Sequence, residues 1–158
     1  MIERSLVIIK PDALQRNLMG EIIGRFEKKG LKIIGMKMAQ LEDVLLEEHY
    51  SHHKDKPFFA SLKKFMKSSP VVAIALEGLE AISAIRLIVG PTKGRAADAG
   101  SIRGDLGMSG QANLVHASDG PETAEAEIKR FFKDDELFNY SKGDWEWVYG
   151  EEERSGDI

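Results

Sequence analysis

Short apolar runs alternate with stretches of helical periodicity along this chain, and this alternation restricts the fold more than any other feature. Residues 5–10, Ser-Leu-Val-Ile-Ile-Lys, form a run rich in β-branched residues that Pro11 stops, and Val71–Leu76 is a second such run. Leu31–Leu41 alternates as a strand, and Asn113–His116 is a fourth short strand. The order of these elements predicts an α/β domain in which helices cover a small sheet.

The segments between the strands repeat apolar residues at the spacing of a helix. They are Met19–Phe26, followed by a stop at Gly30; Asp43 to about His53; a short helix opened by Pro57; Leu79–Val89; and a helix after His116 that carries Ala124, Ile128, Phe131 and Phe132 on one side. Residues 90–112 show no periodicity, and so long an irregular loop inside a compact domain is usually functional or disordered.

Local signals refine these boundaries. Asp12 is the predicted N-cap of the first helix, and Gly78 is expected to end the third strand. Asp119 and Glu122 are spaced as in a capping box, and Pro121 suits the first turn of the last of these helices. His116 is therefore expected just before a helix N-terminus, where unpaired amide groups favour an anion.

Size and composition predict one domain of 158 residues, with a C-terminal extension from about residue 140 whose last residues are expected to be mobile. Trp145, Trp147 and Tyr149 in this extension are predicted to dock on the body of the protein or on another subunit. The chain has no cysteine, no secretory pattern and no apolar run of membrane-spanning length, so a cytoplasmic location is expected. A net charge of −4 disfavours nucleic acid and anionic membranes as partners.

Common catalytic motifs are missing. The sequence contains no Gly-x-x-x-x-Gly-Lys-Ser/Thr loop, no dinucleotide fingerprint and no Gly-x-Ser-x-Gly elbow, which excludes the usual phosphate-loop enzymes and serine hydrolases. Glu48, His49, His52 and His53 fall at helical spacing and offer a metal site, but a polar helix face near its C-terminus explains them better.

Cations and one histidine point instead to an anionic substrate. Lys10 ends a buried strand, and the irregular loop brings Thr92, Arg95 and Arg103, with Arg86 one turn before it. Arginines can clamp several phosphate oxygens, and a neutral imidazole is a nucleophile. Glu127 could hold one ring nitrogen of His116 and leave the other free. Each residue alone is more simply a surface cation or a structural histidine, but together they predict phosphoryl transfer without a phosphate loop.

Six segments carry a resemblance to a known family. They are Val7–Asp12, Gly20–Glu27, Pro57–Phe59, Gly90–Thr92, Gly100–Asp105 and Asn113–Asp119, the last reading Asn-Leu-Val-His-Ala-Ser-Asp. From Leu6 to about Phe132, the chain resembles the nucleoside diphosphate kinases. The resemblance implies a ferredoxin-like βαββαβ fold with a four-stranded antiparallel sheet. It also implies a ping-pong transfer of the γ-phosphoryl of a nucleoside triphosphate, mainly ATP, to a nucleoside diphosphate.

The resemblance further implies roles for particular residues. His116 is the phosphohistidine nucleophile, supported by Glu127 and Ser118. The phosphates or the sugar are contacted by Lys10, Tyr50, Arg86, Thr92, Arg103 and Asn113, with Lys10 and Tyr50 also taking part in catalysis. Phe58 stacks on the base, with Leu62 beside it. Mg²⁺ is expected mainly on the nucleotide phosphates, with Asp119 contributing indirectly through water.

Two further implications concern assembly and departures from the family pattern. A symmetric homo-oligomer is expected, a hexamer rather than a tetramer. Lys93 and Gly94 differ from the common Asn-Pro in a loop that supports subunit contacts, and Gly110 differs from an apolar residue placed against the base in some members. No catalytic side chain is lost. The alternative is a non-catalytic nucleotide-binding or regulatory protein on the same fold.

Overall fold

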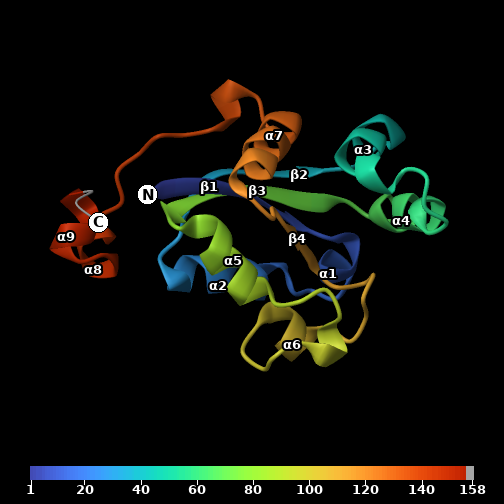
Figure 1. Cartoon of the computed structure of the whole chain (residues 1–158), viewed down its shortest axis with the longest axis horizontal. Helices are drawn as coiled ribbons and strands as arrows, with labels where there is room; N and C mark the ends of the chain where they lie inside the picture. The colour runs from blue at the N-terminus through green and yellow to red at the C-terminus, as the bar shows by residue number, and fades with distance from the viewer. Residues whose placement is uncertain (156–158) are drawn as a thin grey trace.

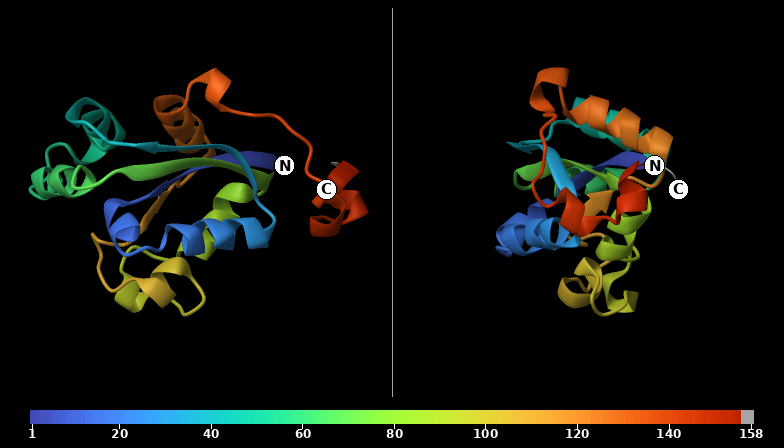
Figure 2. Two further views of the ribbon diagram at one scale, coloured as in Figure 1. Left: turned by 180° about the vertical axis from the view of Figure 1, so that it is seen from behind. Right: turned by 90° about the vertical axis from the view of Figure 1, so that its left-hand side faces the viewer.

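The computed structural model describes residues 1–155 and has a central antiparallel sheet with helices on both faces (Figures 1 and 2). Its strands are β1 (Ile2–Ile9), β2 (Lys32–Ala39), β3 (Val71–Leu79) and β4 (Val115–Ala117), in the order β2-β3-β1-β4. Every neighbouring pair is antiparallel. The ferredoxin-like arrangement implied by the family resemblance is therefore confirmed.

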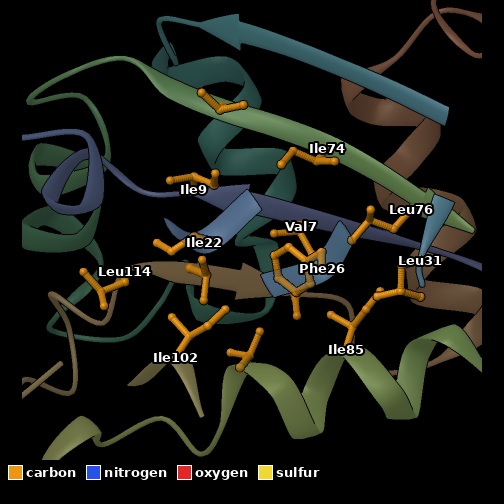
Figure 3. Packing of buried hydrophobic residues seen from close by; sticks show 14 of the residues in the cluster. Val7, Ile9, Ile22, Phe26, Leu31, Ile74, Leu76, Ile85, Ile102 and Leu114 are labelled. Atoms are coloured by element: carbon orange, nitrogen blue, oxygen red, sulfur yellow. The ribbon is translucent and has the colours of Figure 1, made fainter. Parts of the chain in front are cut away.

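One face of the sheet is covered by α1 (Pro11–Gln15), α2 (Met19–Lys29), α5 (Ala81–Val89) and α6 (Ile102–Leu106). Figure 3 shows their side chains meeting those of the strands, with Phe26 beside Val7 and Ile85 beside Leu31. Successive residues of a strand point to opposite faces, and both faces of β1 are buried. This explains why its apolar run is continuous instead of alternating.

The other face is covered by α3 (Asp43–His49), the 3₁₀ turn η1 (Ser51–His53), α4 (Phe59–Met66) and α7 (Pro121–Phe131). Leu6 and Ile8 of β1 pack here with Leu46, Met66 and Phe131. In Figure 1, α7 lies above the sheet and α5 below it, so the two clusters are separated by the strands. The helix that follows His116 therefore belongs to a different layer from the helices that follow Ile9 and Leu79.

The chain after α7 continues through the 3₁₀ turn η3 (Asp134–Glu136) to two short helices, α8 (Trp145–Val148) and α9 (Glu151–Ser155). These lie beside the start of β1 in both views of Figure 2. The Tyr140 hydroxyl donates to the carbonyl oxygen of Ile33 at 2.6 Å, and the Tyr149 hydroxyl oxygen accepts from Leu79 N–H at 3.2 Å. Trp147 remains 86% exposed. The last residues of the tail, predicted to be mobile, lie outside the described range.

Several predicted boundaries were wrong. The N-cap of α1 is Lys10, with Pro11 in the first turn, and the Asp12 side chain does not cap the helix. Gly120 is the N-cap of α7, so the spacing of Asp119 and Glu122 does not form a capping box. In both cases the proline at the first position sets the start of the helix.

Two further corrections concern strands and the irregular loop. Gly78 lies inside β3 instead of ending it, and a Cβ there would meet the Tyr149 hydroxyl oxygen at 2.9 Å. β4 begins at Val115, two residues later than predicted, because Leu114 has a left-handed φ of +74°. The loop of residues 90–112 contains the 3₁₀ turn η2 (Gly94–Ala96) and α6, which are too short to show periodicity. No helix within residues 1–155 has the length and apolar character needed to cross a membrane.

Candidate active site

His116 occupies the middle of β4, the strand at one edge of the sheet. Its neighbours Val115 and Ala117 pack into the cluster beneath α5. Strand alternation therefore turns His116 to the opposite face, where α3 and α7 lie. β4 pairs with β1 in a register that sets His116 across from Ile8. The side chain is 22% exposed and lines a pocket at this edge.

Glu127 of α7 links two side chains of the Asn-Leu-Val-His-Ala-Ser-Asp segment. Its Oε2 lies 2.7 Å from His116 Nε2, and its Oε1 accepts from the Ser118 hydroxyl at 2.6 Å. Ser118 Oγ also accepts from Leu6 N–H at 3.1 Å, which ties the group to the central strand. An ionised carboxylate only accepts hydrogen bonds, so His116 Nε2 carries the hydrogen, and in the neutral form of the ring Nδ1 is the nitrogen with a free lone pair.

The charge of Glu127 is maintained in a buried position. Burial alone would raise the pKa of this carboxyl. The hydrogen bond from His116 opposes burial, a positive charge on the His116 ring acts in the same direction whenever the ring is protonated, and the Ser118 hydrogen bond adds to them, so that the pKa is lowered. Glu127 is therefore ionised near neutral pH and fixes the orientation of His116.

Lys10 and Asn113 form a second buried group. Lys10 Nζ donates to Asn113 Oδ1 at 2.7 Å, and Asn113 Nδ2 donates to the carbonyl oxygens of Thr92 and Gly110, each at 3.0 Å. Burial and the charge of Arg103 lower the pKa of Lys10 to about 8, although Asp12 acts in the opposite direction. Lys10 is thus a cation held in a poorly solvated place, where its charge acts strongly on a nearby anion.

Arg103 joins the loops around this group. Its Nε, Nη1 and Nη2 donate to the carbonyl oxygens of Asn113, Gly90 and Val115 at 3.1, 2.9 and 2.6 Å. Each terminal nitrogen keeps a second N–H for a ligand. Burial, with the nearby charge of Arg86, lowers the pKa of Arg103 to about 10. Arg86 itself is exposed, lines the pocket, and makes no hydrogen bond or ion pair within residues 1–155.

The pocket brings together seven of the predicted site residues and has a cavity volume of about 410 Å³. These residues are Tyr50, Arg86, Thr92, Arg103, His116, Asp119 and Glu127. Its volume falls in the range of small-molecule sites. The Tyr50 hydroxyl is buried without a hydrogen-bond partner among the described residues, and burial followed by the charge of Glu127 raises its pKa. Tyr50 therefore remains a protonated donor.

The two residues predicted for the base do not line this pocket. Phe58 is 46% exposed, and its ring centre lies 5.2 Å from that of His53, which does line the pocket. Leu62 is 9% exposed and belongs to the cluster beneath α3 and α7. Phe58 thus offers a partly exposed ring beside a residue of the pocket, whereas Leu62 packs in the core.

Sequence reasoning missed the role of His49 in this site. Its buried ring lies 4.8 Å from that of His116 between ring centres, and its Nδ1 accepts from Arg130 Nη1 at 3.0 Å. His49 Nδ1 is also 3.5 Å from Glu127 Oε2. The periodicity of residues 43–53 placed His49 on a helix, but nothing in the spacing showed that it would face a strand more than sixty residues away.

The ligand atoms of the four residues considered for a metal, Glu48, His49, His52 and His53, do not form one cluster within the described residues. The ligand atoms that do lie within 4.8 Å of one another belong to His49, His116 and Glu127. Arg130 already uses the Nδ1 lone pair of His49, and its charge opposes a cation there. Two imidazoles also suit Mg²⁺ poorly, since this ion prefers oxygen ligands. Asp119, which is exposed and lines the pocket, offers carboxylate oxygens instead.

The remaining loop residues separate into those at the site and those outside it. Arg95 donates to the carbonyl oxygen of Met108 at 3.3 Å and does not line the pocket, so it does not join the predicted clamp. Gly94 packs against the Gly107 backbone so closely that a Cβ would collide with it. Gly110 has only an ordinary contact with Lys93 at the position of a Cβ. The loop therefore depends on glycine at residue 94.

Comparison with known proteins agrees with this geometry. The sequence profile described as "Nucleoside diphosphate kinase" matches residues 3–137. A protein of this name from Parabacteroides distasonis is 57% identical over 139 residues, covering 88% of this chain and 91% of that protein. Another from Archaeoglobus fulgidus is 49% identical over 150 residues, covering 95% and 99% of the two chains.

A solved structure extends the likeness to three dimensions. The halophilic nucleoside diphosphate kinase from Halobacterium salinarum, solved in complex with CDP, superposes with a TM-score of 0.92 at 43% identity, covering 94% of this chain and 99% of that one. The profile covers most of the chain, the relatives share about half of its residues, and the fold is common to both. The chain therefore belongs to the nucleoside diphosphate kinase family.

Proposed function

We propose that this chain transfers the γ-phosphoryl group of a nucleoside triphosphate, mainly ATP, to a nucleoside diphosphate through phosphorylated His116. The observation that carries this proposal is the chain of contacts from Ser118 to Glu127 to His116. It leaves Nδ1 as the ring nitrogen without a hydrogen bond within residues 1–155, on a side chain that lines the pocket. The non-catalytic alternative has no support, since the relatives are named as kinases and no predicted catalytic side chain is missing.

In the first half-reaction, His116 Nδ1 attacks the γ-phosphorus in line with the bond to the β–γ bridging oxygen. A P–N bond forms, that P–O bond breaks, and the nucleoside diphosphate leaves with the bridging oxygen. In the second half-reaction, a terminal phosphate oxygen of another nucleoside diphosphate attacks the same phosphorus and the P–N bond breaks. Glu127 keeps its hydrogen bond to Nε2 throughout and offsets the positive charge that develops on the ring.

The surrounding cations and donors act mainly by positioning and by charge neutralisation. Arg86 is free of protein partners within residues 1–155 and is suited to a mobile phosphate, whereas Arg103 presents N–H groups from a fixed guanidinium. Lys10, Tyr50 and Thr92 add a buried ammonium and two hydroxyls. Asn113 is suited to the sugar or phosphates because its amide is fixed by Lys10 and by two carbonyl oxygens.

Base recognition is proposed to rest on Phe58. Every base has a π-face, so stacking on the exposed ring tolerates different nucleotides. Leu62 supports this surface from the core side. Mg²⁺, when bound on the nucleotide phosphates, would offset their charge, and Asp119, whose side chain lines the pocket, would bind it through water.

We further propose a homo-oligomer, a hexamer rather than a tetramer, and a cytoplasmic location. Exposed apolar side chains support self-association; they include Met36, Met38, Leu87 and Trp147. The absence of cysteine supports a reducing compartment, and the net charge of −4 supports nucleotides rather than nucleic acid as partners. Light scattering on the purified protein would give the number of subunits.

Labelling with γ-³²P ATP tests the phosphohistidine. We expect the wild-type protein to take up acid-labile, alkali-stable phosphate without an acceptor, and to pass it on when GDP is added. His116→Ala should take up none, whereas His52→Ala should still be labelled, because the His52 side chain makes no hydrogen bond to the His116–Glu127 pair. Labelling of His116→Ala at the wild-type level would overturn the proposal.

A further inference from the structure

Leu114 holds a conformation that its side chain does not favour. It is a fully buried leucine with a φ of +74°, in the left-handed region where residues other than glycine are uncommon. Both of its backbone polar groups are bound by the segment that follows β1. Its N–H donates to Asp12 Oδ2 at 3.1 Å, and its carbonyl oxygen accepts from Lys10 N–H at 2.8 Å. Hydrogen bonds with Lys10 and Asp12 thus hold the turn at Leu114.

The conformation of Leu114 determines where two functional segments go. Before it stands Asn113, whose Oδ1 accepts from Lys10 Nζ and whose carbonyl oxygen accepts from Arg103 Nε. After it β4 begins and carries His116. A change of φ at Leu114 would rotate Asn113 relative to β4 and separate the buried Lys10–Asn113 pair from the strand that bears the nucleophile.

The Asp12 carboxylate has a second oxygen with a different environment. Oδ1 is buried and has no hydrogen-bond partner among the described residues. Its charge acts on Lys10, which is also faced by Arg103 and by the neutral amide of Asn113. Burial and Arg103 lower the pKa of Lys10 to about 8, and Asp12 raises it. Without Asp12, the ammonium would lose its proton at a lower pH.

We propose that Asp12 is a positioning residue for phosphoryl transfer, which holds the left-handed turn at Leu114 with Oδ2 and places a negative charge near the buried ammonium of Lys10. Asp12 does not line the pocket, so it acts through Leu114, Asn113 and Lys10. The inference rests on the proposed phosphate-binding role of Lys10. It assigns a role to an aspartate that the sequence suggested only as a helix cap.

Two substitutions separate the two roles. Asp12→Asn keeps an oxygen that can accept from Leu114 N–H but removes the charge, and Asp12→Ala removes both. The experiment measures kcat/KM for ATP from pH 6 to 9.5, because this quantity reports ionisation in the free enzyme. Asp135→Asn, which removes a charge at an exposed position of η3, is the matched control. Thermal unfolding of each variant shows whether the fold is intact.

In the wild type, kcat/KM should fall at high pH as Lys10 loses its proton; this fall is the alkaline limb of the profile. For Asp12→Asn we expect the alkaline limb to move to lower pH, with kcat/KM near the wild-type value at pH 6.5 and about 3- to 10-fold below it at pH 8.5. Asp12→Ala should show the same shift and a further loss of about tenfold at every pH. Asp135→Asn should follow the wild type. A destabilised fold alone would lower the unfolding temperature without moving the limb.

An unchanged alkaline limb in Asp12→Asn would overturn the inference. Lys10→Met distinguishes this result from a failure of the proposed function. If Lys10→Met loses activity while Asp12→Asn keeps the wild-type profile, only the role of Asp12 is wrong. If Lys10→Met is fully active, the phosphate-binding role of Lys10 fails, and the inference about Asp12 fails with it.

Discussion

The segment around His116 and the C-terminal segment differ in how they are held. Ser118 and Glu127 are buried; the Ser118 hydroxyl donates to Glu127, and its oxygen accepts from Leu6 N–H of a central strand. The C-terminal segment, by contrast, is attached by hydrogen bonds of Tyr140 and Tyr149 and leaves Trp147 in solvent. Reaction chemistry requires fixed geometry, so the first region should tolerate little change and the second much more.

Burial of polar groups marks the functional region of this chain better than aromatic content does. The C-terminal segment contains three of the chain's large aromatic residues, Trp145, Trp147 and Tyr149. The most deeply buried polar side chains, apart from Ser5 at 0% exposure, instead include Ser118 at 0%, Asn113 at 3% and Glu127 at 4%. Burying such groups costs free energy unless each is paired. Their hydrogen bonds offset this cost, and two of the three, Ser118 and Glu127, form the group that holds His116.

Glu127→Gln should give the largest change, because it keeps the shape of the side chain and removes the charge that orients His116. We expect kcat to fall about 100-fold, with a smaller change in KM, since the interaction strengthens as charge develops on the ring. Steady-state exchange between ATP and a second nucleoside diphosphate measures this. Glu125→Gln, two residues away and exposed on α7, is the control. Equal activity of both variants would contradict the role of Glu127.

Ser118→Ala removes the donor to Glu127 Oε1 and the acceptor of Leu6 N–H. We expect unfolding to become easier by about 1.5–3 kcal/mol, because a buried hydrogen bond to a charged group is lost and another donor is left unpaired. Activity should fall about tenfold. Urea unfolding and the exchange assay test the two effects, with the exposed Ser141→Ala as control. Wild-type stability in Ser118→Ala would remove Ser118 from the supporting group.

His49 makes stability depend on pH. Burial, followed by the charges of His116 and Arg130, lowers its pKa to about 3, although Glu127 acts in the opposite direction. In the unfolded chain its pKa is near the ordinary value of 6.5. Below pH 6.5 the unfolded chain therefore binds a proton at His49 that the folded protein does not bind. The free energy of unfolding decreases as the pH falls. The limiting slope is about 1.4 kcal/mol per pH unit for one such group.

Urea unfolding between pH 5 and pH 7 measures this slope. We expect the free energy of unfolding of the wild type to decrease by about 2 kcal/mol from pH 7 to pH 5. His49→Gln should lose clearly less, because the buried imidazole is gone. His52→Gln, at an exposed position, should keep the wild-type slope. Parallel curves for the wild type and His49→Gln would show that the folded protein and the unfolded chain protonate His49 equally, and would contradict the lowered pKa.

The sequence predicted most of the architecture because its signals are local. Helical spacing, β-branched runs and the stop at Gly30, where φ is +97°, located the main elements. Sheet order could not be predicted from periodicity and came from the family resemblance alone. Short elements such as α6 escaped because five residues do not complete enough turns to show a period.

The candidate site was predictable where a motif carried it and not where contacts were distant. His116, Ser118 and Glu127 lie on one segment of the chain, so spacing could suggest that Glu127 reaches back. The contact between His49 and His116 depends on how α3 packs over β4, and the bond from Leu114 to Asp12 spans a hundred residues. No local pattern encodes such pairs.

Trp147→Ala should give the smallest effect and tests how firmly the C-terminal segment, or tail, is held. The side chain is 86% exposed, so removing it from a lone subunit should change stability by less than about 0.5 kcal/mol and leave the exchange activity unchanged. Urea unfolding at several protein concentrations, with light scattering, measures both stability and assembly. A loss of stability that appears only when the protein is highly diluted would mean that another subunit covers Trp147 in the oligomer. In that case the tail would be as firmly held as the segment around His116, but between subunits.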